Sequence, residues 1–492
     1  MLQKFRRALA LFSFVGITLL FLDISGALHH WLGWLAKIQF WPALLALNVG
    51  VIVGLVVLTL VFGRIYCSVI CPLGILQDLI ARLNRKKNHY SYSPEKKWLR
   101  YGMLVVFLGC FAAGIGAVVS LLAPYSSFGR IATHLLGPLY AWGNNVLAAI
   151  AAHFNSYAFY GHEVWLKSIW AVAVAGATLL VVGWLAWRYG RTYCNTICPV
   201  GTMLSLLARF SWFRIFFDTE KCKNCGKCSR NCKASCIDFK THSVDYSRCV
   251  VCGNCLEQCS FDALHYAHPK HSPKAATAPA GEPDKGRRSM LLSLASFTAV
   301  GAMAQVKKKV DGGLAAIEDK VEPTRRTRLT PPGSVSTAHF AKHCTACQLC
   351  VSECPNQVLR PGSDLTAFLQ PHMSYERGFC RPECHRCSEV CPTGAIKPIS
   401  LEDKSSTQIG HAVWLGQNCV ILTDGVKCGN CMRHCPAGAI MMVPVNPDDE
   451  NSPEVPAVDE SRCIGCGACE NVCPARPFSA IYVEGHEVHR FN

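Results

Sequence analysis

The sequence lacks the short motifs that mark several common classes of enzyme. It has no glycine-rich nucleotide loop and no regular haem-attachment motif. No Ser–His–Asp triad and no pair of catalytic carboxylates can be nominated either. These absences argue against a stand-alone enzyme of the nucleotide-dependent, haem-dependent or hydrolytic classes.

Acidic residues are scarce as well. The chain has 33 Asp and Glu against 49 Lys and Arg, which gives a formal net charge of +16. Much of the basic excess stands beside apolar stretches, as is typical of membrane topology signals. We therefore expect contact with membrane lipid and no nucleic-acid partner.

Charge is missing altogether from three long apolar stretches. These are Leu44–Gly63, Tyr101–Tyr125 and Ser168–Trp187, and each fits a spanning helix of about 20 residues. A shorter stretch, Ala8–Leu22, follows a basic N-terminus. The pattern predicts an α-helical membrane domain with four transmembrane helices over residues 1–212.

The loops between these stretches predict the orientation. The loop over residues 82–100 is rich in Lys and Arg, whereas the connector from Pro124 to Trp165 has Arg130 as its one basic residue. Positive loops stay in the cytoplasm, so we expect a multi-pass protein of the inner (cytoplasmic) membrane with the connector outside. Four connector residues could accept protons there, although a solvated loop is the simpler interpretation: His134, His153, His162 and Glu163.

An internal repeat accompanies the second and fourth stretches. Residues 63–74 read GRIYCSVICPLG and residues 190–201 read GRTYCNTICPVG. In each, Pro then Gly opens a run with helical apolar spacing, which predicts a short helix at the membrane surface. A pseudo-twofold axis could bring the four cysteines together as a metal site, a cluster site or redox dithiols; alternatively, each motif only shapes a helix start. The four are Cys67, Cys71, Cys194 and Cys198.

Thirty cysteines are present, and most fall into runs typical of [4Fe–4S] clusters. Residues 213–268 contain two runs in which three close thiolates would bind one cluster and the fourth would reach its neighbour. The first predicted ligand set is Cys222, Cys225, Cys228 and Cys259, and the second is Cys249, Cys252, Cys255 and Cys232. Cys236 and Cys110 are left over and are expected to be buried thiols.

Four further runs occupy residues 341–492 and predict four more clusters. Adjacent runs could exchange their fourth cysteine, or the outer and inner runs could pair, and the spacing does not decide between them. The runs are Cys344, Cys347, Cys350 and Cys354; Cys380, Cys384, Cys387 and Cys391; Cys419, Cys428, Cys431 and Cys435; and Cys463, Cys466, Cys469 and Cys473.

Zinc and haem fit these cysteine runs less well than clusters do. Zinc favours isolated cysteine pairs rather than paired runs of four. Cys380, Cys384 and His385 resemble a widened haem-attachment motif, but Cys387 and Cys391 complete a cluster run. The sequence therefore predicts about six [4Fe–4S] clusters in α+β ferredoxin-like domains.

Residues 269–340 form the linker between the two cysteine-rich regions. Within it, residues 286–304 begin with twin arginines, continue as a short apolar run and end on small residues. This pattern resembles a twin-arginine export signal, and a fifth anchor helix is the alternative. On the export interpretation, residues 213–268 are cytoplasmic and residues 305–492 are periplasmic.

These features together resemble a fusion of two families from the periplasmic nitrate reductase system of anaerobic respiration. Residues 1–268 resemble NapH, a membrane ferredoxin with paired CxxxCP motifs and a two-cluster domain, and residues 286–492 resemble the NapG/MauM four-cluster ferredoxin-type proteins. The resemblance implies quinol as electron donor from the quinone pool and a periplasmic reductase or cytochrome as partner. The chain would then be an electron-transfer subunit rather than a stand-alone enzyme.

Two alternative functions stay open. FixG-type membrane ferredoxins, which assist assembly of a respiratory oxidase, are similar over residues 60–268. A redox-sensing membrane regulator, whose clusters report the state of the quinone pool, is the second alternative.

Overall fold

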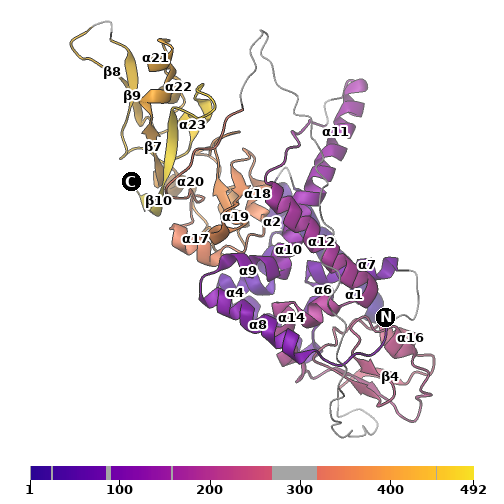
Figure 1. Cartoon of the computed structure of the whole chain (residues 1–492). Coiled ribbons are helices and arrows are strands. Elements are labelled where there is room, and N and C mark those ends of the chain that lie inside the picture. The colour runs from indigo at the N-terminus through magenta and orange to yellow at the C-terminus, as the bar shows by residue number, and fades with distance from the viewer. Residues whose placement is uncertain are drawn as a thin grey trace, which may run out of the picture.

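The computed structural model describes residues 2–23, 26–84, 90–156, 159–268, 319–449 and 452–491 (Figure 1). The expected export signal or fifth helix at residues 286–304 lies outside the described residues. So does the middle of the basic loop, residues 85–89.

The helical part of the chain extends to residue 208 (Figure 1). Its elements are α1 (Leu2–Leu22), α2 (Ala27–Leu32), α3 (Trp34–Lys37), α4 (Phe40–Leu45), α5 (Val49–Phe62), α6 (Tyr66–Val69), α7 (Pro72–Leu83), α8 (Lys97–Ala112), α9 (Gly116–Leu122), α10 (Pro124–Ile131), the π-helix η1 (Ala132–Leu136), α11 (Gly137–His153), α12 (Ile169–Tyr189), α13 (Thr192–Thr196) and α14 (Pro199–Ala208).

Two helices of the described residues are long and apolar enough to cross a membrane. They are Gln3–Leu22, within α1, and Ile169–Tyr189, which is α12. The helix predicted at Ala8–Leu22 thus begins six residues earlier, at Leu2, because Arg6 and Arg7 have partners in the fold. Arg6, for example, lies 3.8 Å from the carboxylate of Asp78.

The second and third predicted spans are each divided, which corrects the expectation of four continuous helices. Between α4 and α5, Leu47 has a φ of 52°, and the Asn48 side chain accepts a hydrogen bond from Val51 N at 3.3 Å and so caps a new helix. Between α8 and α9, Gly114 has a φ of 74°, which ends the first helix. The uniformly apolar sequence of these stretches does not predict where the helices end.

The connector between residues 124 and 165 is not a solvated loop throughout. Helix α10 begins with Pro124 at its first position, and all eight of its residues are buried. A Cβ on Gly129 would lie 2.3 Å from the carbonyl oxygen of Cys347, so α10 packs directly on the C-terminal part. Helix α10, including the connector's one arginine, Arg130, is thus buried between two parts of the protein.

Short strands and one-turn helices make up the two cysteine-rich parts, as expected for an α+β ferredoxin-like fold. Residues 213–268 contain β1 (Arg214–Phe217), α15 (Lys227–Arg230), β2 (Ile237–Asp238), β3 (Ser243–Val244), α16 (Asn254–Gln258) and β4 (Leu264–Ala267). Strand β1 pairs with β4, and β2 with β3, both antiparallel.

The C-terminal part contains three further antiparallel pairs, β5–β6, β7–β10 and β8–β9. Its elements are α17 (Thr337–His343), α18 (Leu349–Glu353), β5 (Leu359–Pro361), η3 (Leu365–Ala367), β6 (Pro371–Met373), α19 (Arg386–Val390), α20 (Leu401–Ser406), β7 (Thr407–Trp414), η4 (Gly416–Asn418), α21 (Val420–Thr423), α22 (Asn430–Arg433), β8 (Ile440–Pro444), β9 (Glu454–Val458), α23 (Ala468–Val472) and β10 (Ile481–Phe491).

Helix α1 contacts a different cysteine-rich part at each end (Figure 1). At its N-terminal end, Gln3 donates to Asn254 at 2.9 Å and Arg7 pairs with Glu257 at 2.9 Å. At its C-terminal end it packs on α18 of the C-terminal part. A helix of 21 residues is about 30 Å long, so this length separates the two parts.

A buried carboxylate joins three segments near the N-terminal end of α1. Asp78 on α7 lies 2.9 Å from Arg191, 3.5 Å from Lys233 and 3.8 Å from Arg6. These cations hold the pKa of the Asp78 carboxyl well below its usual range, against the effect of burial. The contact fixes α1 and the first cysteine-rich part onto the repeat.

A glycine pair offers a test of the packing in the C-terminal part. Gly467 (φ 78°) would place a Cβ 2.2 Å from the buried Tyr375 ring, whereas Gly425 (φ 64°) has nothing within 4 Å. Gly425→Ala should lower the free energy of unfolding by about 1–2 kcal/mol, because alanine is strained at this φ. Gly467→Ala should lower it by about 1–3 kcal/mol more, because the Tyr375 ring must also shift. Thermal unfolding followed by circular dichroism measures both, and equal shifts would contradict rigid packing at Tyr375.

Candidate functional site

The cysteines of residues 213–268 gather as the spacing predicts. Cys222, Cys225 and Cys228 line one hollow together with Cys259, the fourth cysteine of the other run. Around the second group, the pKa of the buried Cys255 thiol is raised by burial and further by the nearby Cys252, Cys249 and Cys232. Each run therefore contributes three thiols to one group and its last thiol to the other.

In each regular run, residues in the left-handed backbone conformation orient the thiols toward one side. In the first run Asn224 (φ 51°) and Gly226 (φ 69°) flank Cys225, and in the second Val251 (φ 51°) and Gly253 (φ 74°) flank Cys252. The regular C-terminal runs repeat this with Ala346 and Gln348, and with Gly465 and Gly467. Strain in non-glycine residues at these positions indicates a backbone that wraps a common centre.

The C-terminal cysteines also form four groups, by exchange between adjacent runs. Three hollows are lined by cysteine quartets. In the fourth group, which comprises Cys344, Cys347, Cys350 and Cys391, burial raises the pKa of Cys344 and Cys350, and the nearby Cys347 and Cys391 raise it further. The quartets are Cys354, Cys380, Cys384 and Cys387; Cys435, Cys463, Cys466 and Cys469; and Cys419, Cys428, Cys431 and Cys473. Of the two arrangements that the spacing left open, the structure has the exchange of fourth cysteines.

The quartets fit iron–sulfur clusters better than single ions. Within the described part of the chain, no three His, Cys, Asp or Glu side chains are arranged to hold one metal ion, as zinc would require. The fourth cysteines also accept backbone N–H bonds, as in Ala263 N to Cys259 Sγ at 3.3 Å and Ala439 N to Cys435 Sγ at 3.3 Å. Such bonds suit thiolate ligands of a cluster and help set its potential.

The two leftover cysteines differ from one another. Cys236 is buried, with its sulfur 3.5 Å from that of Cys232, so it lies beside the second group as a spare thiol. Cys110 on α8 is only partly buried, which corrects the expectation of a buried thiol there.

The structure brings the four cysteines of the repeat to one buried site. All four are buried, and the pKa of Cys198 is raised by burial and then by the charges of Cys194, Cys71 and Cys67. Two arginines cross between the halves: Arg64 donates to Cys194 O at 3.2 Å, and Arg191 donates to Cys67 O.

Glycine is required where each arginine crosses. A Cβ on Gly201 would lie 2.2 Å from Cys194 O and 3.0 Å from Arg64 Nη2. The equivalent Cβ on Gly74 would lie 2.3 Å from Cys67 O and 2.9 Å from Arg191 Nη1. The repeated Gly-Arg and Pro-x-Gly residues thus build one shared site. Their repetition indicated a common role, but the spacing alone did not predict which groups they contact.

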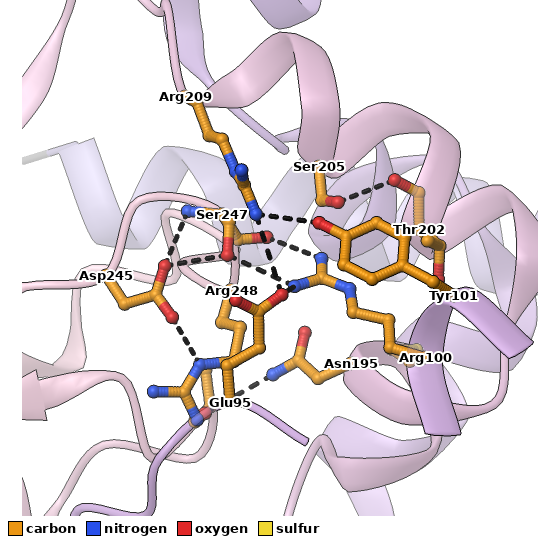
Figure 2. A network of polar contacts seen from close by, with 12 residues as sticks. Glu95, Arg100, Tyr101, Asn195, Thr202, Ser205, Arg209, Asp245, Ser247 and Arg248 are labelled. Carbon is orange, nitrogen blue, oxygen red and sulfur yellow. Dashed lines mark hydrogen bonds and ion pairs between the residues drawn. The ribbon is translucent and has the colours of Figure 1, made fainter. Parts of the chain in front are cut away.

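The shared site is held against the second cysteine group by a polar network (Figure 2). Ser247, two residues before Cys249, accepts hydrogen bonds at its carbonyl from Arg100 at 2.9 Å and Arg64 at 3.0 Å. Asn195 of the repeat donates to Ala234 O at 3.3 Å. The loops on both sides of this cysteine group are therefore fixed to the CxxxCP segments.

The connector residues named from the sequence divide into two sets. His134, His162 and Glu163 line one cavity of about 370 Å³, whereas His153 is exposed on the last turn of α11 and does not line it. Sequence reasoning missed Glu353 of α18, which lines the same cavity. Its place directly before Cys354 was the only available signal.

Comparisons with known proteins match 4Fe-4S families to the repeat and to the C-terminal part. The 4Fe-4S binding domain family matches residues 44–89 and 169–218, which contain the two CxxxCP segments, and the 4Fe-4S dicluster domain family matches residues 343–401 and 426–476. The methylamine utilization ferredoxin-type protein MauM of Methylobacillus flagellatus is 32% identical over 167 residues, which is 33% of this chain and 70% of MauM. The chain belongs to the MauM family of ferredoxin-type proteins.

Two further relatives support this membership. The ferredoxin-type protein NapG of Escherichia coli is 28% identical over 39% of this chain and 83% of its own length. The ferredoxin-type protein NapF of the same organism is 27% identical over 34% of this chain and 99% of its own length. No solved structure matches the chain. The protein is thus an iron–sulfur electron-transfer protein of the ferredoxin type.

The exchange of fourth cysteines can be tested by pairs of substitutions. Cys354 groups with Cys387 and not with Cys347. Cys354→Ala with Cys387→Ala should therefore remove about four irons, and Cys354→Ala with Cys347→Ala about eight. Iron and acid-labile sulfide analysis after anaerobic purification measures the loss, and the reverse order would contradict the grouping.

Proposed function

We propose that the protein is a membrane-bound electron carrier with about six [4Fe–4S] clusters, which oxidises quinol and passes the electrons to a periplasmic reductase or cytochrome. The observation that carries this proposal is the set of six cysteine quartets in two separate ferredoxin-type parts. The 24 motif cysteines are the proposed ligands. When bound, the clusters would supply one-electron transfer, and the protein supplies their spacing and burial.

A transmembrane position for the helical part is supported by its surface. Helices α1 and α12 have membrane length, and many apolar side chains of α5, α8, α11 and α12 are exposed, among them Val53, Val105, Trp142 and Leu180. Exposed apolar side chains in this number suit a lipid environment. The divided helices would still cross as α4–α5 and α8–α9, because the backbone at each break makes local hydrogen bonds: Asn48 caps α5, and Ile115 N donates to Cys110 O at 2.8 Å.

The resemblance to NapH supports a quinol donor for residues 1–268, and the relatives NapG and MauM support a four-cluster electron-transfer role for residues 341–492. An assembly factor of the FixG type would explain the first region but leaves the four C-terminal quartets without a use. The acceptor is therefore proposed as a redox protein rather than an oxidase under assembly.

The shared CxxxCP site is proposed as an additional redox centre, either a cluster or a set of redox dithiols. Arg64 is fully buried and, among the described residues, has no carboxylate within ion-pair distance. Its Nη2 donates to Cys67 Sγ at 3.8 Å. An unpaired buried charge is costly, so an anionic centre formed by Cys67, Cys71, Cys194 and Cys198 would stabilise this arrangement.

Reduction by quinol tests the proposed function. The anaerobically purified chain should contain about 24 irons or more, and a menaquinol or ubiquinol analogue should bleach its visible absorbance. Dithionite reduction serves as the control for intact clusters. Stoichiometric zinc with little iron, or clusters that dithionite reduces but no quinol does, would contradict the proposal.

The two ferredoxin-type parts should face opposite sides of the membrane, because α1 holds one at each end. A protease site inserted after Pro447, beyond β8, should be cut by protease added to intact spheroplasts. The same site inserted after Thr241, between β2 and β3, should be cut only after lysis. Protection of both sites in spheroplasts would place the C-terminal part in the cytoplasm.

A further inference from the structure

A cavity of about 370 Å³ lies where the helical part meets the C-terminal part. Its walls include the last residues of α1 (Phe21, Leu22), His134 of η1, Trp165 before α12, and Glu353 with Cys354 from the end of α18. The volume lies within the range of about 300–1,000 Å³ that is usual for small-molecule sites. Lys167 closes one wall by donating to Val351 O at 2.9 Å.

Two buried polar groups in the cavity wall lack a partner. His134 is 5% exposed and Glu353 is 3% exposed, and His134 Nε2 and Glu353 Oε1 have no hydrogen-bond partner among the described residues. Buried polar atoms are normally paired, so these two atoms point to a ligand that offers hydrogen-bonding groups to both. The two hydroxyls of a quinol head group are of that kind.

The approach to the cavity is apolar. Pro138 and Tyr140 at the start of α11 form part of its lining, and the same helix exposes 66% of Leu139 and 65% of Trp142. A long isoprenoid tail could lie along this surface while the head group occupies the cavity. A small water-soluble substrate would gain nothing from these side chains.

We propose that this cavity is the quinol-oxidation site and that electrons enter the protein at the quartet Cys354, Cys380, Cys384 and Cys387. The inference rests on the proposed function above and deepens it. It places electron entry in the C-terminal part, at the ligand cysteine that itself lines the cavity, and not at the CxxxCP site.

The chemistry balances with the groups present. Both O–H bonds of the quinol break and its two electrons leave, which gives one quinone and two protons. Cys354, Cys380, Cys384 and Cys387 would hold the one-electron acceptor beside the cavity. Cys344, Cys347, Cys350 and Cys391 would hold a second one-electron acceptor, so that the two together could take both electrons.

Both protons leave to water at the mouth of the cavity, where the exposed His162 and Glu163 form the lining. Burial lowers the pKa of His134 to about 3, so its ring stays neutral. Its Nε2 can then accept a hydrogen bond from a quinol hydroxyl and hold that O–H group in place.

Photolabelling of the unaltered full chain is the first test. An azidoquinone should crosslink, on illumination, to peptides that contain His134, Trp165 or Glu353, and excess unlabelled quinone should suppress this. Crosslinks confined to the CxxxCP segments would overturn the proposal even if quinol reduces the clusters.

Substitutions give the second test, with binding and reduction as separate readouts. His134→Phe and Glu353→Gln should each weaken binding of a redox-inert quinone analogue, measured by calorimetry, by about tenfold. Reduction by quinol should slow similarly, with dithionite-reduced spectra unchanged. Glu383→Gln is the matched control, because Glu383 also precedes a cysteine of this quartet, Cys384, but is exposed and outside the cavity lining.

The outcomes separate the two proposals. If quinol reduces the unaltered chain and both cavity variants behave like Glu383→Gln, the cavity proposal is wrong and the proposed function stands. If no quinol reduces the unaltered chain and no azidoquinone labels it, the proposed function and the cavity proposal both fail.

Discussion

Asp78 carries the one charge on which the N-terminal architecture depends. Its buried carboxylate faces cations from α1, from the second half of the repeat and from the first ferredoxin-type part. Removing ions from water costs several kcal/mol each unless they are paired. Four charged groups can be buried here only together, so the three segments must assemble around the carboxylate in one arrangement.

The same region shows why the repeat and the first ferredoxin-type part form one unit. Arg64 reaches both Cys194 O and Ser247 O, and Arg191 N donates to Lys233 O at 2.8 Å. The backbone beside Cys232 and Cys249 is therefore positioned by groups of the CxxxCP segments. The second cysteine quartet and the shared site keep a fixed separation, which electron transfer between them would require.

Some of this architecture could be predicted from the sequence because it is local or duplicated. The runs of cysteines gave the three-plus-one grouping of residues 222–259, and the repeat gave the meeting of Cys67, Cys71, Cys194 and Cys198. Helices α7 and α14 start at Pro72 and Pro199, as the Cys-Pro dipeptides predicted. In each case the relevant contacts lie within one segment or between two copies of it.

Other features depended on contacts that no local pattern contains. The break at Leu47 follows from a capping side chain, and the burial of α10 follows from packing on Cys347. His134 was assigned to a solvated connector because the residues that cover it come from α18, more than two hundred positions away. Pairing in the C-terminal part was undecided for the same reason, since spacing within a run does not specify its partner run.

The reciprocal crossing of the arginines also constrains how the two halves could have diverged after duplication. A side chain added at Gly74 would displace the arginine of the other half, and one added at Gly201 would displace the arginine of the first. Each half thus has a glycine that leaves room for the arginine of the other half. A larger residue at either glycine would therefore disturb both CxxxCP segments, although more than a hundred residues separate them in the sequence.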